Sequence, residues 1–179
     1  MIIHDHYLNC ASQIASPNCD QRPNWDISLL VIHCISLPPE QFEGDYIDQL
    51  FCNTLNPKDH PYFEEIYQFR VSAHLLIRRN GLIRQYVPFN LRAWHAGVSN
   101  YKGREQCNDF SIGIELEGSI KQDFTDDQYQ RLAEVVRVLL LAYPGLSRQA
   151  IVGHSDIAPH RKTDPGPLFD WERFYSLLG

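Results

Sequence analysis

S-L-L-V-I-H, residues 28–33, is an almost unbroken run of apolar, mostly branched side chains that ends in a histidine. Such a run is typical of a strand that is buried on both faces of a sheet. In open α/β sheets, functional groups gather beyond the carboxyl ends of buried strands. The run therefore predicts the central strand of the fold and makes His33 a candidate functional residue.

A second strand is predicted at 111–117, where S-I-G-I-E-L-E alternates between apolar and other side chains. Successive residues of a strand point to opposite faces of the sheet, so Ile112, Ile114 and Leu116 share one face. Glu115 and Glu117 share the other. We expect the first face to pack against the core and the second to offer two carboxylates to a site.

The remaining segments complete an α/β pattern. Asn80 and Gly81 favour a tight hairpin between strands at 70–77 and 82–87. T-D-D-Q, residues 125–128, has the form of a capping box, and the helix that it opens should run to about Tyr143. The sequence also predicts short helices at 45–51 and 171–178, loops at 56–61 and 88–109, and an irregular arm at 1–27. We expect a single domain over residues 1–179, with the arm packed on it.

The composition narrows the class of protein. Apolar residues make up 44% of the chain and charged residues 21%, which is typical of a globular domain and not of a disordered chain. The formal net charge of −6 argues against nucleic-acid binding, which needs basic surfaces. The apolar stretch at 138–143 is too short to cross a bilayer, and we expect no secretory signal at 1–10. Five cysteines without a C-x-x-C pair predict a reduced, cytoplasmic protein.

A polar segment follows a short apolar run near the end of the chain: I-V-G-H-S-D-I-A-P-H-R-K-T-D-P-G-P, residues 151–167. Its three prolines exclude a continuous helix, because proline removes a backbone donor and clashes with the preceding turn. We expect a stiff loop that presents side chains suited to metal binding or proton transfer, namely His154, Asp156, His160, Lys162 and Asp164. A solvated surface turn is the alternative.

Three of these candidates form a metal-binding set. Catalytic zinc commonly takes three protein ligands from His, Cys, Asp and Glu. His33, His154 and Asp164 supply such a set from beyond two predicted strands. A zinc ion there would lower the pKa of a bound water to about 7 and polarise an amide carbonyl.

Two further groups are suited to act on a polarised carbonyl group. Lys162 is suited to hold negative charge that develops on a carbonyl oxygen, although an ordinary surface lysine is the alternative. Glu115 is a candidate general base. Glu117 faces the same way two residues later, so the residues alone leave the choice between the two carboxylates open.

Other reactive side chains favour structural roles. Cys34 adjoins His33, but neighbouring residues of a strand point to opposite faces, so a buried thiol is favoured over a nucleophile. His74 and His95 are candidates for buried structural histidines. Trp94, beside His95, is suited to form a stacking wall for a sugar or peptide.

Ordered motifs along nearly the whole chain resemble a known family. They are S-L-L-V-I-H-C-I-S-L-P-P, H-P-Y-F, V-S-A-H-L-L-I-R-R-N-G, A-W-H-A-G-V-S, C-N-D-F-S-I-G-I-E-L-E-G and I-A-P-H-R-K-T-D-P-G-P-L-F-D-W. With these motifs the chain is similar to the AmpD-type N-acetylmuramoyl-L-alanine amidases, zinc hydrolases that act on anhydro-muropeptides in bacterial cell-wall recycling. The resemblance implies a fold like that of the peptidoglycan-recognition proteins, with a mixed central β-sheet flanked by helices.

The resemblance also implies roles for particular residues. Its three zinc ligands correspond to His33, His154 and Asp164. The catalytic acidic residue corresponds to Glu115 rather than Glu117, and the lysine that supports the oxyanion to Lys162. The implied substrate is a small muropeptide, cleaved between the lactyl group of 1,6-anhydro-N-acetylmuramic acid and L-alanine. We further expect a monomer without membrane insertion and four substrate contacts, from Tyr62, Arg70, Trp94 and His95.

The chain departs from the family pattern at three positions. Cys34 stands in place of asparagine, Gln106 in place of arginine and His160 in place of glutamate. None of these changes removes an expected zinc ligand. A non-catalytic muropeptide-binding module on the same fold is the alternative, but recognition proteins of that kind tend to lack a ligand.

Overall fold

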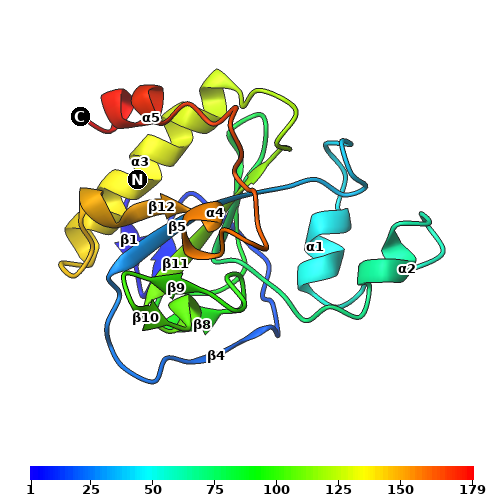
Figure 1. Cartoon of the computed structure of the whole chain (residues 1–179), viewed down its shortest axis with the longest axis horizontal. Coiled ribbons are helices and arrows are strands. Elements are labelled where there is room, and N and C mark those ends of the chain that lie inside the picture. Colours follow the sequence, from blue (N-terminus) through cyan, green and yellow to red (C-terminus); the bar gives the residue numbers. More distant parts are fainter.

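The computed structural model describes residues 1–179 and contains a six-stranded mixed sheet (Figure 1). In spatial order its strands are β12 (Ile151–Gly153), β5 (Leu29–Ile35), β11 (Ser111–Glu117), β6 (Leu75–Ile77), β7 (Ile83–Gln85) and β3 (Ser12–Gln13). The first four strands run parallel, β7 is antiparallel to β6, and β3 is parallel to β7. The predicted mixed central sheet is confirmed, with β5 and β11 among its inner strands.

Both faces of β5 and β11 are covered. Residues Leu29 to Ile32 are fully buried, and all seven residues of β11 are buried even though their sequence alternates. One face of β11 packs in the main apolar core through Ile112, Ile114 and Leu116. The alternation therefore separates an apolar face from a polar face that is also inside the protein.

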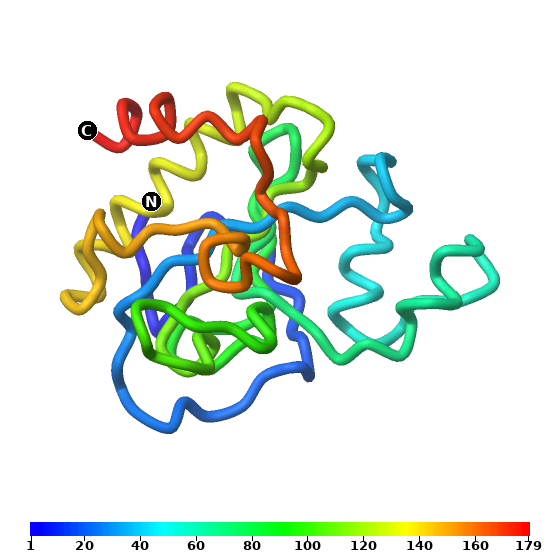
Figure 2. Tube along the Cα trace, in the orientation of Figure 1, coloured from blue at the N-terminus to red at the C-terminus, as the bar shows by residue number.

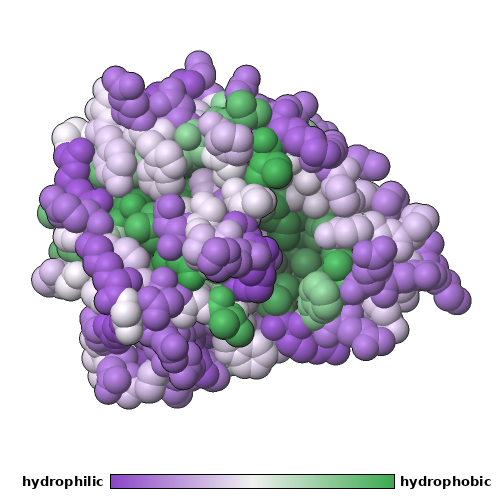
Figure 3. Space-filling model, in the orientation of Figure 1, coloured by the Kyte–Doolittle hydropathy of each residue, from purple (hydrophilic) through white to green (hydrophobic).

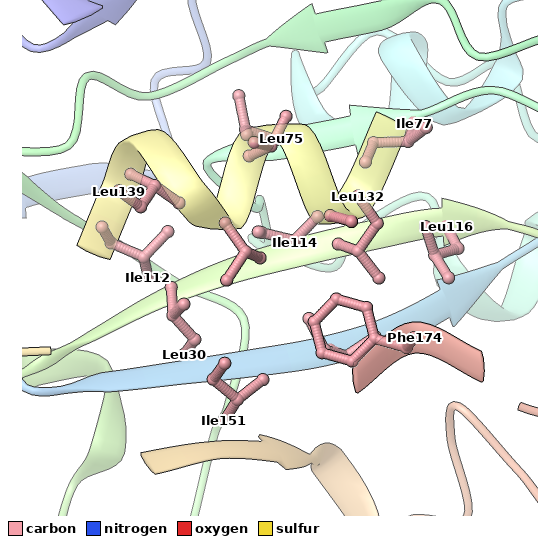
Figure 4. Close-up of a cluster of buried hydrophobic side chains, with 14 of the residues drawn as sticks. Leu30, Leu75, Ile77, Ile112, Ile114, Leu116, Leu132, Leu139, Ile151 and Phe174 are labelled. Atoms are coloured by element: carbon pink, nitrogen blue, oxygen red, sulfur yellow. The ribbon is translucent and has the colours of Figure 1, made fainter. Parts of the chain in front are cut away.

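Two helices cover the apolar face of the sheet: α3 (Asp126–Ala142) and α5 (Trp171–Leu178). The predicted capping box opens α3, with Thr125 Oγ1 accepting the Gln128 backbone N–H at 3.2 Å. Figure 4 shows Leu132 and Leu139 of α3 and Phe174 of α5 directed at the side chains of β5, β11 and β6. Burial of this face against two amphipathic helices is the main apolar contribution to the fold.

The opposite face carries loops and a small helical lobe. The helices α1 (Tyr46–Phe51) and α2 (Phe63–Ile66) share a second apolar cluster with Leu76 and Tyr86 of the sheet region. Figures 1 and 2 show this lobe standing to one side of the sheet, whereas both chain termini lie on the other side. No helix of the protein is long and apolar enough to span a bilayer.

The N-terminal arm, which we expected to be irregular, instead contains short strands, one of which lies at the edge of the sheet. It contains a hairpin of β1 (Ile3–His4) with β2 (Tyr7–Leu8), the edge strand β3, and β4 (Cys19–Gln21), which pairs with β8 (Leu91–Ala93). Arg22 fixes the arm by donating to the carbonyl oxygens of Phe89, Asn108, Asp109 and Ser111. These partners are remote in sequence, so local patterns do not reveal them.

The segment predicted as a long loop, 88–109, is also more regular than expected. Besides β8 it holds the hairpin of β9 (Asn100–Tyr101) with β10 (Arg104–Glu105) and the short 3₁₀ helix η1 (Cys107–Asp109). A second such turn, η2 (Arg148–Ala150), leads into β12. Each of these elements is two or three residues long, which is too short to produce a readable period in the sequence.

Two local predictions need correction. Only Gly81 of the Asn80-Gly81 pair has a positive φ, +76°, and its N–H donates to the Arg78 carbonyl at 2.9 Å. The hairpin therefore closes through a loop of more than two residues between Ile77 and Ile83. The polar segment after β12 begins with a helical turn, α4 (His154–Ile157), rather than with loop. Pro159 lies beyond this turn, so it ends the turn without preventing it.

Candidate active site

The register of three adjacent strands brings the predicted site residues together. His33 on β5 pairs with Glu115 on β11, and Gly153 on β12 pairs with Ile32. His154 follows Gly153 directly. The carboxyl ends of neighbouring parallel strands meet at one edge of a sheet, so His154, His33 and Glu115 lie side by side there.

His33, His154 and Asp164 converge on one point. Their ligand atoms form a triangle, in which Nδ1 of His33 lies 2.9 Å from Nδ1 of His154 and 3.0 Å from Oδ2 of Asp164, and the third side measures 3.1 Å. Tetrahedral zinc with ligands at about 2.0–2.1 Å holds its ligand atoms about 3.3 Å apart. The triangle is close to that size, so the three side chains are suited to hold a metal ion.

The charges of the triangle match this donor set. Burial lowers the pKa of His33 to about 4, which outweighs the opposing hydrogen bond to Asp164 and keeps the imidazole neutral. Burial opposes ionisation of Asp164, but the adjacent His154 and His33, whose Nδ1 atoms lie 3.1 and 3.0 Å from Oδ2, hold its pKa below the usual range. Neutral imidazoles and an anionic carboxylate are the forms in which these side chains bind zinc.

The far nitrogens of both histidines also have partners. Nε2 of His154 lies 3.1 Å from the carbonyl oxygen of Ala96. A carbonyl oxygen only accepts, so Nε2 carries the hydrogen and Nδ1 of the neutral ring has a free lone pair. Nε2 of His33 lies 2.9 Å from Nδ1 of His95. The loop A-W-H-A-G therefore lies behind the triangle. Residue type does not indicate this contact, because Ala96 acts through its backbone carbonyl.

The two glutamates of β11, which the sequence did not separate, have different surroundings. Glu117 is paired with Arg78 at 2.8 Å and accepts the backbone N–H groups of Glu43 and Arg79. Oε2 of Glu115 is buried without any hydrogen-bond partner. Burial raises the pKa of Glu115 well above 4.5; the charge of Asp164 adds to the increase, and Lys162 opposes it. Glu115 is the carboxyl free to take part in proton transfer.

A cleft of about 400 Å³ opens over these groups. Its polar side includes the metal-binding triangle, Glu115 and Lys162, and its apolar side is formed by residues of the α1 and α2 region, among them Phe51 and Ile66. Figure 3 shows apolar side chains gathered in a hollow between the body of the molecule and this lobe. The cleft thus has polar, titratable side chains on one side and apolar side chains on the other.

The four predicted substrate contacts divide into two groups. Tyr62 and His95 line the cleft. Arg70 is exposed and donates to the carbonyl oxygens of Tyr67 and Phe69, outside the cleft lining. Trp94 is also outside it, with its backbone N–H bound to Ser72 Oγ at 3.2 Å.

The remaining candidates have other surroundings. Nδ1 of the buried His74 accepts the Gly113 backbone N–H at 3.0 Å, and Nε2 lies 3.0 Å from the Leu91 carbonyl, so this ring is fully engaged in the fold. Cys34 lines the cleft, where burial, with Glu115 nearby, raises the pKa of its thiol and disfavours the nucleophilic thiolate. His160 and Gln106 are exposed beside a separate cavity and are not among the converging ligands.

Comparison with known proteins agrees with this geometry. The family model of N-acetylmuramoyl-L-alanine amidase matches residues 21–167. The 1,6-anhydro-N-acetylmuramyl-L-alanine amidase AmpD of Haemophilus influenzae is 66% identical over 172 residues, covering 96% of this chain and 94% of that protein. The crystal structure of a selenomethionine derivative of AmpD has a TM-score of 0.97 at 56% identity, and the match covers 100% of both chains.

A more distant structure contains a bound substrate. It is the complex of the amidase AmiD from Escherichia coli with anhydro-N-acetylmuramic acid-L-Ala-D-γ-Glu-L-Lys, with a TM-score of 0.61 and 30% identity. The match covers 98% of this chain and 65% of AmiD. From these similarities the chain belongs to the N-acetylmuramoyl-L-alanine amidase family, among its AmpD-type members.

Proposed function

We propose that this chain is a zinc-dependent amidase that cleaves muropeptides between the lactyl group of 1,6-anhydro-N-acetylmuramic acid and L-alanine. The observation that carries the proposal is the convergence of His33, His154 and Asp164 beside the unpartnered carboxyl of Glu115. The names of the AmpD relatives support the reaction, and the AmiD complex supports the class of substrate. A role in cell-wall recycling and a cytoplasmic location follow as predictions.

His33, His154 and Asp164 would hold the zinc ion. When bound, zinc lowers the pKa of a water molecule to about 7 and polarises a carbonyl group. Other residues of the chain would bind the substrate and transfer the proton. The three ligand residues line the same cleft as Glu115 and Lys162, so an amide bound beside the ion would lie near both side chains.

Glu115 moves the proton. The pKa of Glu115 is raised toward neutral pH, and a general acid–base group is most effective when its pKa lies near the working pH. As a carboxylate, Glu115 takes a proton from the attacking water. The resulting carboxylic acid then gives that proton to the leaving nitrogen of L-alanine, so that the amide bond breaks to a carboxylate and an amine.

Lys162 stabilises the charge that develops on the carbonyl oxygen. It is half-buried on the polar side of the cleft, and its backbone N–H is fixed to the Ala158 carbonyl at 2.9 Å. A cation aimed at a developing oxyanion typically contributes about 10²–10³ in rate. The ammonium group therefore assists the step in which the amide carbonyl becomes tetrahedral.

The cleft suits a small amphipathic ligand. Its volume of about 400 Å³ is within the range of small-molecule sites. Its apolar wall, which includes Phe51 and Ile66, excludes water from one side of the reacting amide. A sugar with a short peptide presents both apolar and polar surfaces, which matches a cleft of this kind.

Metal removal with product analysis tests the proposal. Protein stripped by a chelator and dialysed should release no L-alanine-terminated peptide from an anhydro-muropeptide, and addition of zinc should restore release, as measured by mass spectrometry. Equal cleavage by stripped and zinc-loaded protein would contradict the zinc mechanism. Tight binding of the muropeptide without any peptide release would instead indicate the non-catalytic binding module.

A further inference from the structure

The A-W-H-A-G loop meets both histidines of the triangle on the sides that face away from it. His95 Nδ1 lies 2.9 Å from His33 Nε2, and the adjoining Ala96 carbonyl lies 3.1 Å from His154 Nε2. The two neighbouring residues thus contact the two histidines from behind. His154 is held by a backbone carbonyl, whereas His33 is held by a side chain, which substitution can remove.

Hydrogen bonds and packing hold His95 in one position in this loop. The backbone N–H groups of His95 and Ala96 both donate to Oδ1 of Asn108, at 3.1 and 2.8 Å. Nε2 of His95 lies 3.1 Å from Oγ of Ser111. A Cβ atom on Gly113 would lie 2.5 Å from the Cγ and Nδ1 atoms of His95, so glycine at this position makes room for the ring.

These contacts account for the residues on the polar face of β11. Ser111 contacts the far nitrogen of His95, Gly113 gives space to its ring, and Glu115 stands next in line at the cleft. Alternate residues of a strand share a face. One face of one strand therefore supports His95 and presents the free carboxyl.

We propose that His95 is a positioning residue for His33. Its Nδ1 accepts a hydrogen bond from the Nε2–H group of His33, so that Nδ1 of His33 keeps its lone pair toward the metal. This inference rests on the zinc site of the proposed function. The outer hydrogen bond of a metal-binding histidine fixes its tautomer and ring orientation, and its loss typically costs 10–100-fold in metal affinity or activity.

Substitution of His95 separates this role from packing. His95→Phe retains a ring of similar size but no acceptor, and His95→Asn loses bulk but retains an oxygen at the place of Nδ1. We expect His95→Phe to bind zinc about 10–100-fold more weakly in a chelator competition assay. His95→Asn should recover most of that affinity. The matched control is His160→Ala, which removes an exposed imidazole outside the triangle and should bind zinc like wild type.

A packing role predicts the opposite order, with Phe tolerated and Asn harmful. A direct substrate contact, which the position of His95 on the cleft also allows, predicts a raised KM with zinc affinity unchanged. Either pattern would overturn the inference. Urea unfolding of each variant shows which proteins are folded in the assay.

A measurement on the unmodified protein needs no variant. In ¹⁵N-labelled, zinc-loaded wild type, we expect the Nε2 proton of His33 to be slow to exchange and to show coupling across the hydrogen bond to Nδ1 of His95. A rapidly exchanging proton without such coupling would refute the inference. If wild type binds no zinc, the proposed function fails; if wild type binds zinc and cleaves substrate while His95→Phe equals it, only the role of His95 fails.

Discussion

Substitution of the two glutamates on the polar face of β11 should give opposite phenotypes. Glu115→Gln keeps the size of the side chain but removes the proton-transfer group. Because general acid–base catalysis typically contributes about 10²–10⁴ in rate, kcat should fall by that factor. The free energy of unfolding should stay equal or rise, since Oε2 of Glu115 is buried without a partner and its charged form is disfavoured by burial.

Glu117→Ala should instead unfold the protein more easily and leave kcat near that of wild type. Its carboxylate is 2.8 Å from Arg78 Nη1, and both side chains are buried. Breaking a buried ion pair costs about 3–5 kcal/mol. We expect about 3 kcal/mol, the lower end, because Arg78 retains Asp45 at 3.5 Å and Asp48 at 3.7 Å. That loss is a large part of a typical stability of about 5–15 kcal/mol.

Urea unfolding and the rate of peptide release from an anhydro-muropeptide measure the two effects on the same preparations. Glu117→Gln is the matched control, because it removes the charge but keeps one oxygen that can accept the backbone N–H of Glu43 or of Arg79. It should be less destabilising than Glu117→Ala. A fall in kcat of equal size in the Glu115 and Glu117 variants, or a loss of stability confined to Glu115→Gln, would refute the assignment.

Four further predictions concern the site and the core. Asp164→Ala should lose most bound zinc and with it peptide release, as measured by metal analysis and mass spectrometry; full zinc occupancy would contradict its role. Lys162→Met should lower kcat by about 10²–10³ with zinc content unchanged, and an unchanged kcat would remove its oxyanion role. Phe174→Ala, at a fully buried side chain, should lower the free energy of unfolding by about 3–5 kcal/mol in urea, and a loss below about 1 kcal/mol would contradict its place in the core. In metal-free protein the pKa of Glu115 is raised above 4.5, so ionisation of this carboxyl opposes folding as the pH rises above that value. The stability advantage of Glu115→Gln in urea unfolding should therefore be absent near pH 4 and grow toward neutral pH. An advantage that does not depend on pH would contradict this prediction.

The central strands and the long helix follow from sequence because their signals are local. The apolar run ending at His33 predicted β5, and the capping box at Thr125 predicted α3. The convergence of His33, His154 and Asp164 was also predictable, because parallel strands bring their carboxyl ends to one edge. Residue type and strand position together carried that information.

The supporting structure did not follow from sequence because its partners are remote. Glu115 and Glu117 have the same residue type and the same face, and their surroundings differ because Glu117 binds partners remote in sequence, such as Arg78, 39 residues away. Arg70 was expected at the substrate but lies outside the cleft, since the turn beside α2 directs it toward Tyr67 and Phe69. The Asn108 side chain accepts the backbone N–H of Ala96, and the Ala96 carbonyl contacts His154; sequence patterns do not indicate either contact.

A crystal structure of zinc-loaded protein, with an anomalous difference map at the zinc absorption edge, tests the central claim most directly. We predict a single strong peak within ligand distance of Nδ1 of His33, Nδ1 of His154 and a carboxylate oxygen of Asp164. A peak on other residues, such as the exposed His160, or the lack of any peak in protein that cleaves the muropeptide, would contradict the account.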